Sequence, residues 1–260
     1  MLRSIEELEK FKIGATDGVI GELKDCYFDD GSWVVRYLVV DSGSWLSSCK
    51  VLLSPYAIRA VDWDGKNIAV MVTKAQVTAS PSIDTAKPVS RQHEREYFGY
   101  YNYPYYWGGT GVWGMGDYPE FVTDSDYERA RADQEQRDEE NDPHLRSCNA
   151  VVGYHVHAAD GDIGHVQSYL VDTRSWAIRY LIVNTSNWWV GHLVLISPEW
   201  IDRVSWDDHS VTIDWTRQAV KDAPIYDPAN PLDRGAESNL YGHYGYTSYY
   251  WDHASHRKIA

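Results

Sequence analysis

The sequence contains one internal repeat that covers most of its length. Shifting the chain by 143 positions aligns residues 2–107 with residues 145–250 without a gap, and 36 of the 106 aligned pairs are identical. The identical positions include glycines, tryptophans and prolines, and they continue into a tyrosine-rich stretch at the end of each copy. Self-similarity in one register over such a length indicates a duplicated structural unit. The chain is therefore predicted to fold as two copies of one small domain.

Each copy has the local pattern of short β-strands. Residues 34–40 and their counterparts 177–183 are rich in β-branched and aromatic side chains, are too short for a helix and are bounded by turn residues. Asp17-Gly18 and Asp160-Gly161 separate short apolar stretches, and an Asp-Gly pair can adopt the positive φ angles of a tight hairpin turn. About six closely spaced strands per copy predict a small barrel or sandwich that closes its own edges.

Two further local signals follow these strands. Asp64-Gly65 predicts another tight turn, but its counterpart, Asp207-Asp208-His209, lacks the glycine, so we expect the second turn to be built differently. Thr73 and Gln76 have the spacing of a capping box, which predicts a short helix that ends before Pro81.

The segment between the copies has a different composition. The chain has a formal net charge of -14, and residues 117–142 contain 11 acidic and 3 basic side chains. Such a segment is predicted to form a solvated helix or to be disordered, because it has too few apolar residues to join a core. The predicted domains are a first barrel at 1–87, an aromatic tail and acidic linker at 88–144, a second barrel at 145–230 and an aromatic C-terminal tail at 231–260.

Charge, hydropathy and cysteine content exclude several classes of protein. The excess of 38 acidic over 24 basic residues is the opposite of what phosphate contacts require, so we expect neither nucleic acid nor an anionic membrane as a direct partner. No apolar run of about 18 residues occurs, and residues 1–12 lack the apolar core of a secretory signal, so a cytoplasmic protein is expected. Cys26, Cys49 and Cys148 show neither disulfide nor zinc spacing, which predicts reduced thiols.

The positions that recur together form a longer pattern. It reads DGxIGxVxxxxxDxxxWxxRYLxV, then W, then VLxSPxxIxxVxWD, and it is complete in the second copy and nearly so in the first. This pattern resembles the PRC-barrel family over roughly residues 2–85 and 145–228. The resemblance implies a small β-barrel used as an adaptor, as in the photosynthetic reaction-centre H subunit and a ribosome maturation factor. The predicted fold class is thus mainly β: two small PRC-type β-barrels, each followed by a short helix and an aromatic tail, joined by a charged linker helix.

Candidate metal-binding histidines do not follow the repeat. His155 and His157 lie on a predicted strand, where alternation places both rings on one face, as a metal site would need. None of the ten histidines recurs at the aligned position, so we expect neither a metal nor another cofactor. The chain has no nucleophile elbow, P-loop or dinucleotide-binding glycine pattern, and no enzymatic activity is predicted.

Carboxylates do recur in both copies. Most are in turn-like contexts, where a carboxylate usually accepts hydrogen bonds from nearby backbone amides, although paired carboxylates can also perform acid–base chemistry. The recurring pairs are Asp17/Asp160, Asp29/Asp172, Asp64/Asp207, Asp84/Asp227 and Glu94/Glu237.

An arginine recurs within the most apolar strand of each copy, as Arg36 and Arg179. Two interpretations remain open. The aliphatic stem could cover the barrel while the guanidinium reaches water. Alternatively, the guanidinium could form a buried structural ion pair with one of the recurring aspartates.

Aromatic residues are the best candidates for binding. Trp45, Trp188 and Trp189 lie in polar loops, where a tryptophan is typical of a protein interface. The tails could stack on a barrel, form a dimer surface or remain loose, and we favour stacking because exposure of so many rings would promote aggregation. Candidate partner-binding residues in the tails are Tyr101, Tyr103, Tyr244 and Tyr246.

Three hypotheses for function follow. The first is a non-enzymatic cytoplasmic adaptor or assembly module that binds an unidentified protein partner, with a homodimer as a further possibility. The second is a soluble accessory factor, similar to the H subunit, in photosynthetic or respiratory electron transfer. The third is a metal-dependent hydrolase centred on His155.

Overall fold

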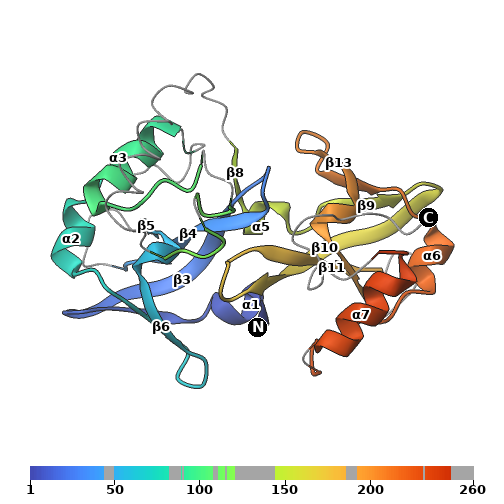
Figure 1. The fold of residues 1–260 in the computed structure, drawn as a ribbon, viewed down its shortest axis with the longest axis horizontal. Helices are drawn as coiled ribbons and strands as arrows, with labels where there is room; N and C mark the ends of the chain where they lie inside the picture. Colours follow the sequence, from blue (N-terminus) through green and yellow to red (C-terminus); the bar gives the residue numbers. More distant parts are fainter. Residues whose placement is uncertain are drawn as a thin grey trace. The chain divides into compact units, whose positions relative to one another are not determined.

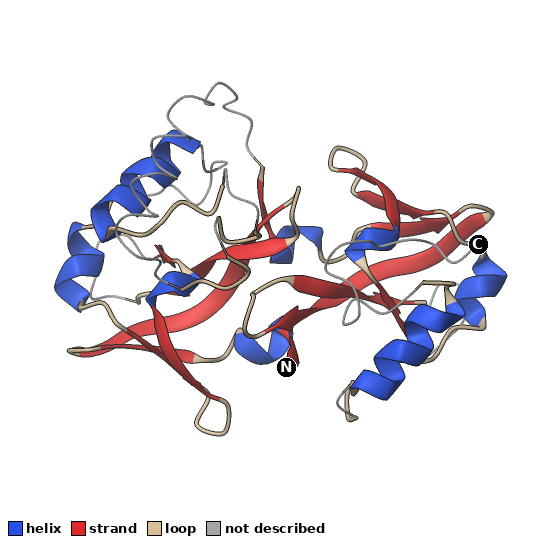
Figure 2. Ribbon diagram, in the orientation of Figure 1, coloured by secondary structure: helices blue, strands red, loops and turns tan. Residues whose placement is uncertain are grey.

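The structure is a computed structural model of the 260-residue chain, and it describes residues 1–43, 50–81, 89, 91–107, 111–114, 116–120, 144–185, 192–230 and 232–246. The chain divides into two compact units, and Figure 1 labels many of their elements. The first comprises Met1, Arg3–Ala150 and Val171–Ile178, and the second comprises Leu2, Val151–Leu170 and Arg179–Ala260. Strands dominate both units (Figure 2), so the predicted mainly β class is confirmed.

The first sheet is mixed. Its strands are β2 (Lys12–Ala15), β3 (Gly18–Asp29), β4 (Val34–Asp41), β5 (Lys50–Leu53), β6 (Ile58–Asp62), β7 (Asn67–Val70) and β8 (Leu145–Ser147). The strand order is β5-β4-β3-β2-β7-β6, and β8 pairs with β3 outside this path. The β2–β7 pair is parallel, and the other pairs are antiparallel.

The second sheet has the same order of equivalent strands. Its strands are β1 (Leu2–Ser4), β9 (His155–Ala158), β10 (Gly161–Asp172), β11 (Ile178–Asn184), β12 (Leu193–Ile196), β13 (Ile201–Ser205) and β14 (Ser210–Ile213). The order is β12-β11-β10-β9-β14-β13, with β1 paired to β10 and a parallel β9–β14 pair. Two similar mixed sheets indicate two copies of one fold, as the repeat predicted.

Closure of each barrel is not detected. The strand pairings of the described residues form an open path in both sheets, from β5 to β6 and from β12 to β13. The sequence gives strand positions through local patterns, whereas closure depends on long-range pairing at the sheet edges. The predicted charged linker helix falls largely on residues 121–143, outside the described part of the chain.

Short helices accompany both sheets. They are α1 (Ile5–Leu8), α2 (Lys74–Ala79), α3 (Arg91–Tyr101), α5 (Cys148–Val151), α6 (Arg217–Lys221) and α7 (Arg234–His243), with 3-10 turns η1 (Pro55–Ala57) and η2 (Pro198–Trp200). The predicted capping box is confirmed at α2, where Thr73 and Gln76 each bond the backbone amide of the other. The predicted end of this helix is also correct, because it stops before Pro81.

The central strand explains why each copy needs the second glycine of its Asp-Gly-x-Ile-Gly motif. Every residue of β4 from Val34 to Val40 is buried, as expected for a nearly continuous apolar strand covered on both faces. A Cβ atom at Gly21 would clash with the backbone carbonyl of Asp41, and one at Gly164 would clash with that of Asn184. The glycine therefore permits the close approach of two neighbouring strands.

One turn prediction was wrong. The loops β6–β7 and β13–β14 both span four residues, although only the first contains a glycine. The positive φ angle falls on Lys66 in one loop and on His209 in the other, at 50° and 52°. Gly65 is therefore not the residue that needs left-handed geometry, and its absence from the second copy leaves the turn unchanged.

Boundaries of the compact units differ from those of the repeat. Strand β8 opens the second copy, yet it pairs with β3 through Ser147 opposite Tyr27. Within the first unit, the Val35 amide also donates to the Trp176 carbonyl, at 2.8 Å. Long-range strand pairing, rather than the register of the duplication, therefore decides where the first unit ends.

Candidate functional site

A buried carboxylate lies at the centre of the first unit. Glu94 on α3 is fully buried, and its Oε1 accepts hydrogen bonds from the hydroxyls of Tyr37 at 3.1 Å and Tyr106 at 2.7 Å. Nε2 of His144 lies 3.3 Å from the second carboxylate oxygen and 3.1 Å from the Tyr106 hydroxyl. Burial, together with the nearby Glu94 charge, raises the pKa of Tyr37 well above its ordinary value. The carboxylate thus accepts hydrogen bonds from a strand and from the aromatic tail, and His144 at the end of the linker lies beside it.

Arg36 lies beside this cluster. Its side chain is 2 % exposed, so the interpretation in which the guanidinium reaches water is wrong for this copy. The guanidinium donates to the Val112 carbonyl at 2.5 Å and to Ser32 Oγ at 2.9 Å, and it lies over the ring of Tyr106 at 3.8 Å. Burial lowers the pKa of Arg36, and the surrounding negative groups partly oppose this effect.

The proposed ion pair of Arg36 is replaced by an indirect contact. No carboxylate of a described residue makes an ion pair with this guanidinium; instead, Ser32 Oγ accepts from Arg36 and donates to Asp29 at 2.9 Å. Cation–π contacts with Tyr106 and Trp113 add to the stabilisation of the buried charge. Arg36 lines a pocket of about 320 Å³, with Asp29, Trp107 and Asp117 among the other lining residues.

The second unit repeats part of this arrangement. Tyr180, the counterpart of Tyr37, donates to the buried Glu237 at 2.9 Å. Arg179 is half-buried. Burial raises the pKa of Tyr241, and the positive charge of Arg179 partly opposes this increase. A tyrosine–glutamate hydrogen bond between the central strand and the following helix is therefore common to both copies.

The sequence pattern does not reveal this hydrogen bond. Glu94 and Glu237 recur together with the turn aspartates, but both lie on helices and are buried. The available signal was a glutamate identical in both copies within a short aromatic-rich segment. Burial of a carboxylate requires specific donors, and the sequence does not show that the tyrosines of the central strand provide them.

The turn interpretation is confirmed for several aspartates. Asp29 accepts hydrogen bonds from the amides of Gly31 and Ser32, as a turn aspartate does. Asp17 and Asp160 also bind backbone amides, but those amides belong to the first residues of α2 and α6. These two carboxylates therefore join each hairpin to a helix N-terminus.

The aromatic tails pack mainly into the units. Tyr103 and Tyr244 are 4 % and 1 % exposed, so as folded they are core residues and not surface contacts. Tyr103 stacks on Tyr56 with ring centroids 5.6 Å apart, which agrees with the preferred interpretation of stacking. Tyr101 and Tyr246 are half-buried. Trp45, Trp188 and Trp189 lie outside the described residues.

Two histidines of the metal hypothesis and two cysteines lie in the described part of the chain. His155 and His157 do share one face of β9, with ring centroids 6.3 Å apart. The described residues contain no cluster of three or more histidine, cysteine, aspartate or glutamate side chains suited to a metal ion. Cys26 and Cys148 are free and buried, and burial raises the pKa of both thiols well above its ordinary value, which makes them poor nucleophiles.

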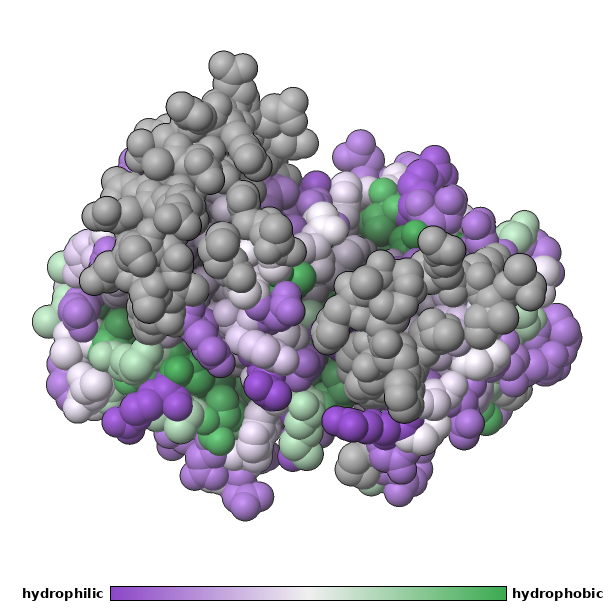
Figure 3. Space-filling model, viewed as in Figure 1, coloured by the Kyte–Doolittle hydropathy of each residue, from purple (hydrophilic) through white to green (hydrophobic). Residues whose placement is uncertain are grey.

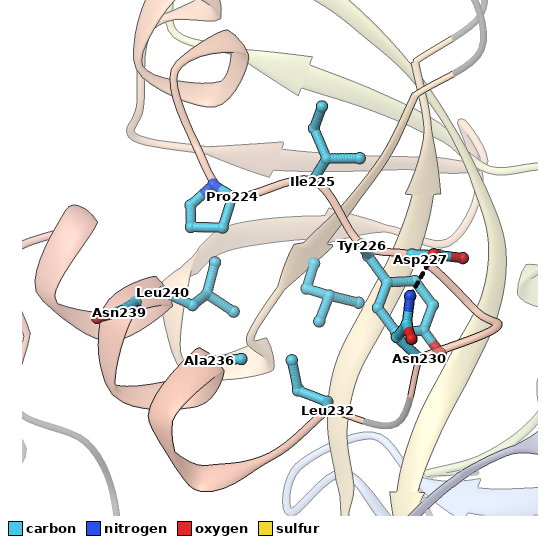
Figure 4. Close-up of a pocket in the computed structure, with 10 residues that line it drawn as sticks. Pro224, Ile225, Tyr226, Asp227, Asn230, Leu232, Ala236, Asn239 and Leu240 are labelled. Atoms are coloured by element: carbon cyan, nitrogen blue, oxygen red, sulfur yellow. Dashed lines mark hydrogen bonds between the residues drawn. The ribbon is translucent and has the colours of Figure 1, made fainter.

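The second unit contains a more apolar pocket, shown in Figure 4. Its volume is about 340 Å³, and its walls come from β12, from the loop after α6 and from α7. Ile225 at its rim is 53 % exposed. Residues from a strand, a loop and a helix line the pocket (Figure 4): Leu195, Pro224, Ile225, Tyr226, Asp227, Asn230, Leu232, Ala236, Asn239 and Leu240.

Comparison with known proteins identifies the first copy. Residues 4–77 match the family model of the PRC-barrel domain. This segment is a PRC-barrel domain. The equivalent strand order of the second sheet indicates a second PRC copy, in agreement with the repeat. No curated protein matches the chain. Among the described residues, no helix is long and apolar enough to cross a membrane.

Proposed function

We propose that this PRC-barrel protein is a non-enzymatic, cytoplasmic adaptor that binds a protein partner. The observation that supports the proposal most directly is the pocket beside α7, whose walls are mainly aliphatic and which has an exposed isoleucine at its rim. Pockets with apolar walls and a few polar groups are suited to recognition of an apolar side chain. In contrast, the recurring carboxylates Glu94 and Glu237 bind tyrosine hydroxyls inside the fold.

Other parts of the proposed contact surface come from the sequence. The loop residues Trp45, Trp188 and Trp189 remain candidates for partner binding, as do the half-buried Tyr101 and Tyr246. On the face shown in Figure 3, hydrophobic residues lie among hydrophilic ones, with several of them grouped towards the lower left of the picture. Apolar residues are normal on a protein surface, so we base the proposal on the pocket.

Affinity capture from the native host tests the proposal. The wild-type chain is compared with Ile225→Asp, which places a charge at the pocket rim, and with Val152→Asp, which changes an exposed apolar residue that does not line the pocket. We expect at least one protein that binds the wild type and Val152→Asp but is lost with Ile225→Asp. If mass spectrometry finds no protein with this behaviour, the adaptor proposal is wrong.

A second candidate function rests on the family match. The PRC-barrel domain at residues 4–77 is compatible with an accessory role, similar to that of the H subunit, in photosynthetic or respiratory electron transfer. Such a protein would co-purify with an electron-transfer complex in membrane fractions. Its absence from these fractions under photosynthetic and respiratory growth would exclude this function.

A further inference from the structure

Side chains of the types that bind transition metals gather on the outer face of the second sheet. Along β9, exposed and buried residues alternate, so His155 and His157 point outward while the residues that follow each of them point inward. The antiparallel neighbour β10 (both strands are labelled in Figure 1) places His165 opposite His155 and Asp162 opposite His157. Directly opposed residues share a face, with Cβ atoms about 4.5–5.5 Å apart. Three histidines and one aspartate therefore lie together on this face.

A β-bulge brings the aspartate to the same face as the histidines. Asp162 and His165 are three residues apart, so a regular strand would direct their side chains to opposite faces. The register of β10 shifts between Asp162 and Gly164, and the extra residue turns both side chains outward. The burial pattern agrees, because Asp162 is exposed and His165 is half-buried, whereas Ile163 between them is buried.

Asp162 orients the ring of His157. Oδ1 of Asp162 lies 2.5 Å from Nδ1 of His157, and both side chains reach solvent. An ionised carboxylate only accepts hydrogen bonds, so Nδ1 carries the proton and Nε2 keeps its lone pair. Histidines that bind metal ions usually donate their other ring N–H to a carboxylate in this way. The His157 ring is thus held in the manner of a metal ligand.

The His155 ring is placed to supply a second nitrogen. It lies at 29° to the His157 ring, with centroids 6.3 Å apart. For a tetrahedral ion with Zn–N distances of about 2.0–2.1 Å, the two rings must tilt towards each other and approach by about 1 Å. Exposed side chains rotate rapidly, and the rotation breaks no hydrogen bond, because no described residue bonds to the His155 ring.

We propose that His155 and His157 chelate one divalent transition-metal ion of the zinc class. Imidazole nitrogens suit zinc, nickel and copper(II), whereas magnesium and calcium prefer oxygen ligands. The described residues contain no preformed group of three or more metal ligands, so water completes the coordination. A site with two protein ligands stays open to exchange, unlike the closed four-ligand site of a structural zinc ion.

The site belongs to the second copy alone. The residues aligned with its histidines and aspartate are Lys12, Gly14, Val19 and Glu22. Absence from the first copy is compatible with a site acquired after the duplication, because a ligand pair on an exposed sheet face requires no change in the core. Metal binding also needs no protein partner, so the inference goes beyond the proposed adaptor function.

Calorimetric titration of the purified full chain with zinc chloride tests the site. We expect saturable binding of one zinc ion per chain and no saturable binding of magnesium. His155→Ala and His157→Ala should each lower the zinc affinity by more than about tenfold, because loss of an outer-shell carboxylate alone typically costs about 10- to 100-fold. The control His243→Ala removes a histidine of α7 and should bind zinc like the wild type.

A separate measurement tests Asp162 as the residue that positions His157. Asp162→Ala should weaken zinc binding by about tenfold or more. It should also change the imidazole ¹⁵N shifts of His157 in the zinc-free chain, since Nδ1 loses its acceptor. Asp162→Glu keeps a carboxylate and should bind zinc more tightly than Asp162→Ala does. Unchanged ¹⁵N shifts and unchanged affinity in Asp162→Ala would overturn the positioning role.

The result that overturns the site is equally specific. No saturable zinc binding, or wild-type affinity in both folded histidine variants, would show that the pair does not chelate the ion. Equal affinity for magnesium and zinc would also overturn it, because the net charge of -14 would then explain the binding. The capture experiment with Ile225→Asp does not depend on zinc, so failure of the metal site and failure of the adaptor proposal are distinguishable.

Discussion

Replacement of Tyr37 by phenylalanine tests whether the buried tyrosine–glutamate hydrogen bond stabilises the first unit. The variant removes one hydroxyl, which donates to Glu94 at 3.1 Å, and it leaves the ring in place. No large cavity forms, because phenylalanine has nearly the same shape as tyrosine. The effect therefore reports the hydrogen bond rather than the packing of the core.

The expected loss of stability in Tyr37→Phe follows from the charge and the burial of the acceptor, Glu94. A hydrogen bond to a charged group contributes about 1.5–3 kcal/mol, and a buried carboxylate that loses a donor keeps its desolvation penalty. Glu94 retains Tyr106 and His144 as neighbours, so the loss should not exceed this range. For a domain of this size, each kcal/mol corresponds to about 2–4 °C in melting temperature. We expect Tyr37→Phe to lower it by about 3–12 °C.

Equilibrium denaturation of the full chain measures this loss. Since the two units can unfold separately, the tyrosine and tryptophan signals are fitted with two transitions, and only the transition of the first unit should move. The matched control is Tyr100→Phe on α3, which removes an exposed hydrogen bond of 2.9 Å to the Gln76 carbonyl. Loss of this neutral hydrogen bond should lower the free energy of unfolding by about 0.5–1.5 kcal/mol or less.

A double-mutant cycle then assigns the energy to the pair. With Glu94→Gln as the second variant, the coupling energy with Tyr37→Phe should be about 0.5–3 kcal/mol. The reasoning is refuted if Tyr37→Phe lowers the free energy of unfolding no more than Tyr100→Phe does. It is also refuted if the coupling energy between Tyr37→Phe and Glu94→Gln is zero within error. Either result would mean that the bond forms without contributing to stability.

Three further predictions concern Tyr101, two glycines and the two buried cysteines. Burial raises the pKa of Tyr101 to about 12 from 10.0. The neutral Tyr101 hydroxyl therefore contributes its full stabilisation below pH 10.0, and this stabilisation is lost as the pH rises through 12. Denaturation at increasing pH, followed together with tyrosinate absorbance, should show the loss. Gly21→Ala should destabilise the first unit by about 1–3 kcal/mol, because the added methyl overpacks it. The control Gly99→Ala adds a methyl that meets no neighbour, so in the same denaturation assay it should be neutral or stabilising by up to about 1 kcal/mol. Cys26 and Cys148 should resist a disulfide reagent in the native chain and react on unfolding; rapid native labelling of both would contradict their burial.

Several features of the site could have been predicted from a closer comparison of the copies. Glu94 and Glu237 are identical in the alignment, and so are Tyr37 and Tyr180. Their identity signals a shared role, but it does not say which tyrosine meets which glutamate. That pairing joins positions 57 residues apart, and only the packing of α3 and α7 against the central strands creates it.

The pocket beside α7 also depends on both the sequence and the tertiary structure. The sequence shows that Leu240 replaces Tyr97, but it does not show whether a pocket forms beside this position. In the structure Leu240 is buried, and the pocket beside it is also lined by Leu232 and Ala236. The cost and size of a cavity depend on how far its neighbours can relax, which the sequence does not encode locally.

The sequence by itself determined the duplication, the short strands, the capping box at Thr73 and the turn role of Asp29. These features depend on residues a few positions apart, and their patterns are visible along the chain. The tertiary structure alone decided the pairing of β8 with β3, the burial of Arg36 and Glu94, and the open pocket beside α7. Each depends on groups from distant positions that must desolvate together, so burial and its partners are properties of the folded unit and not of any one segment.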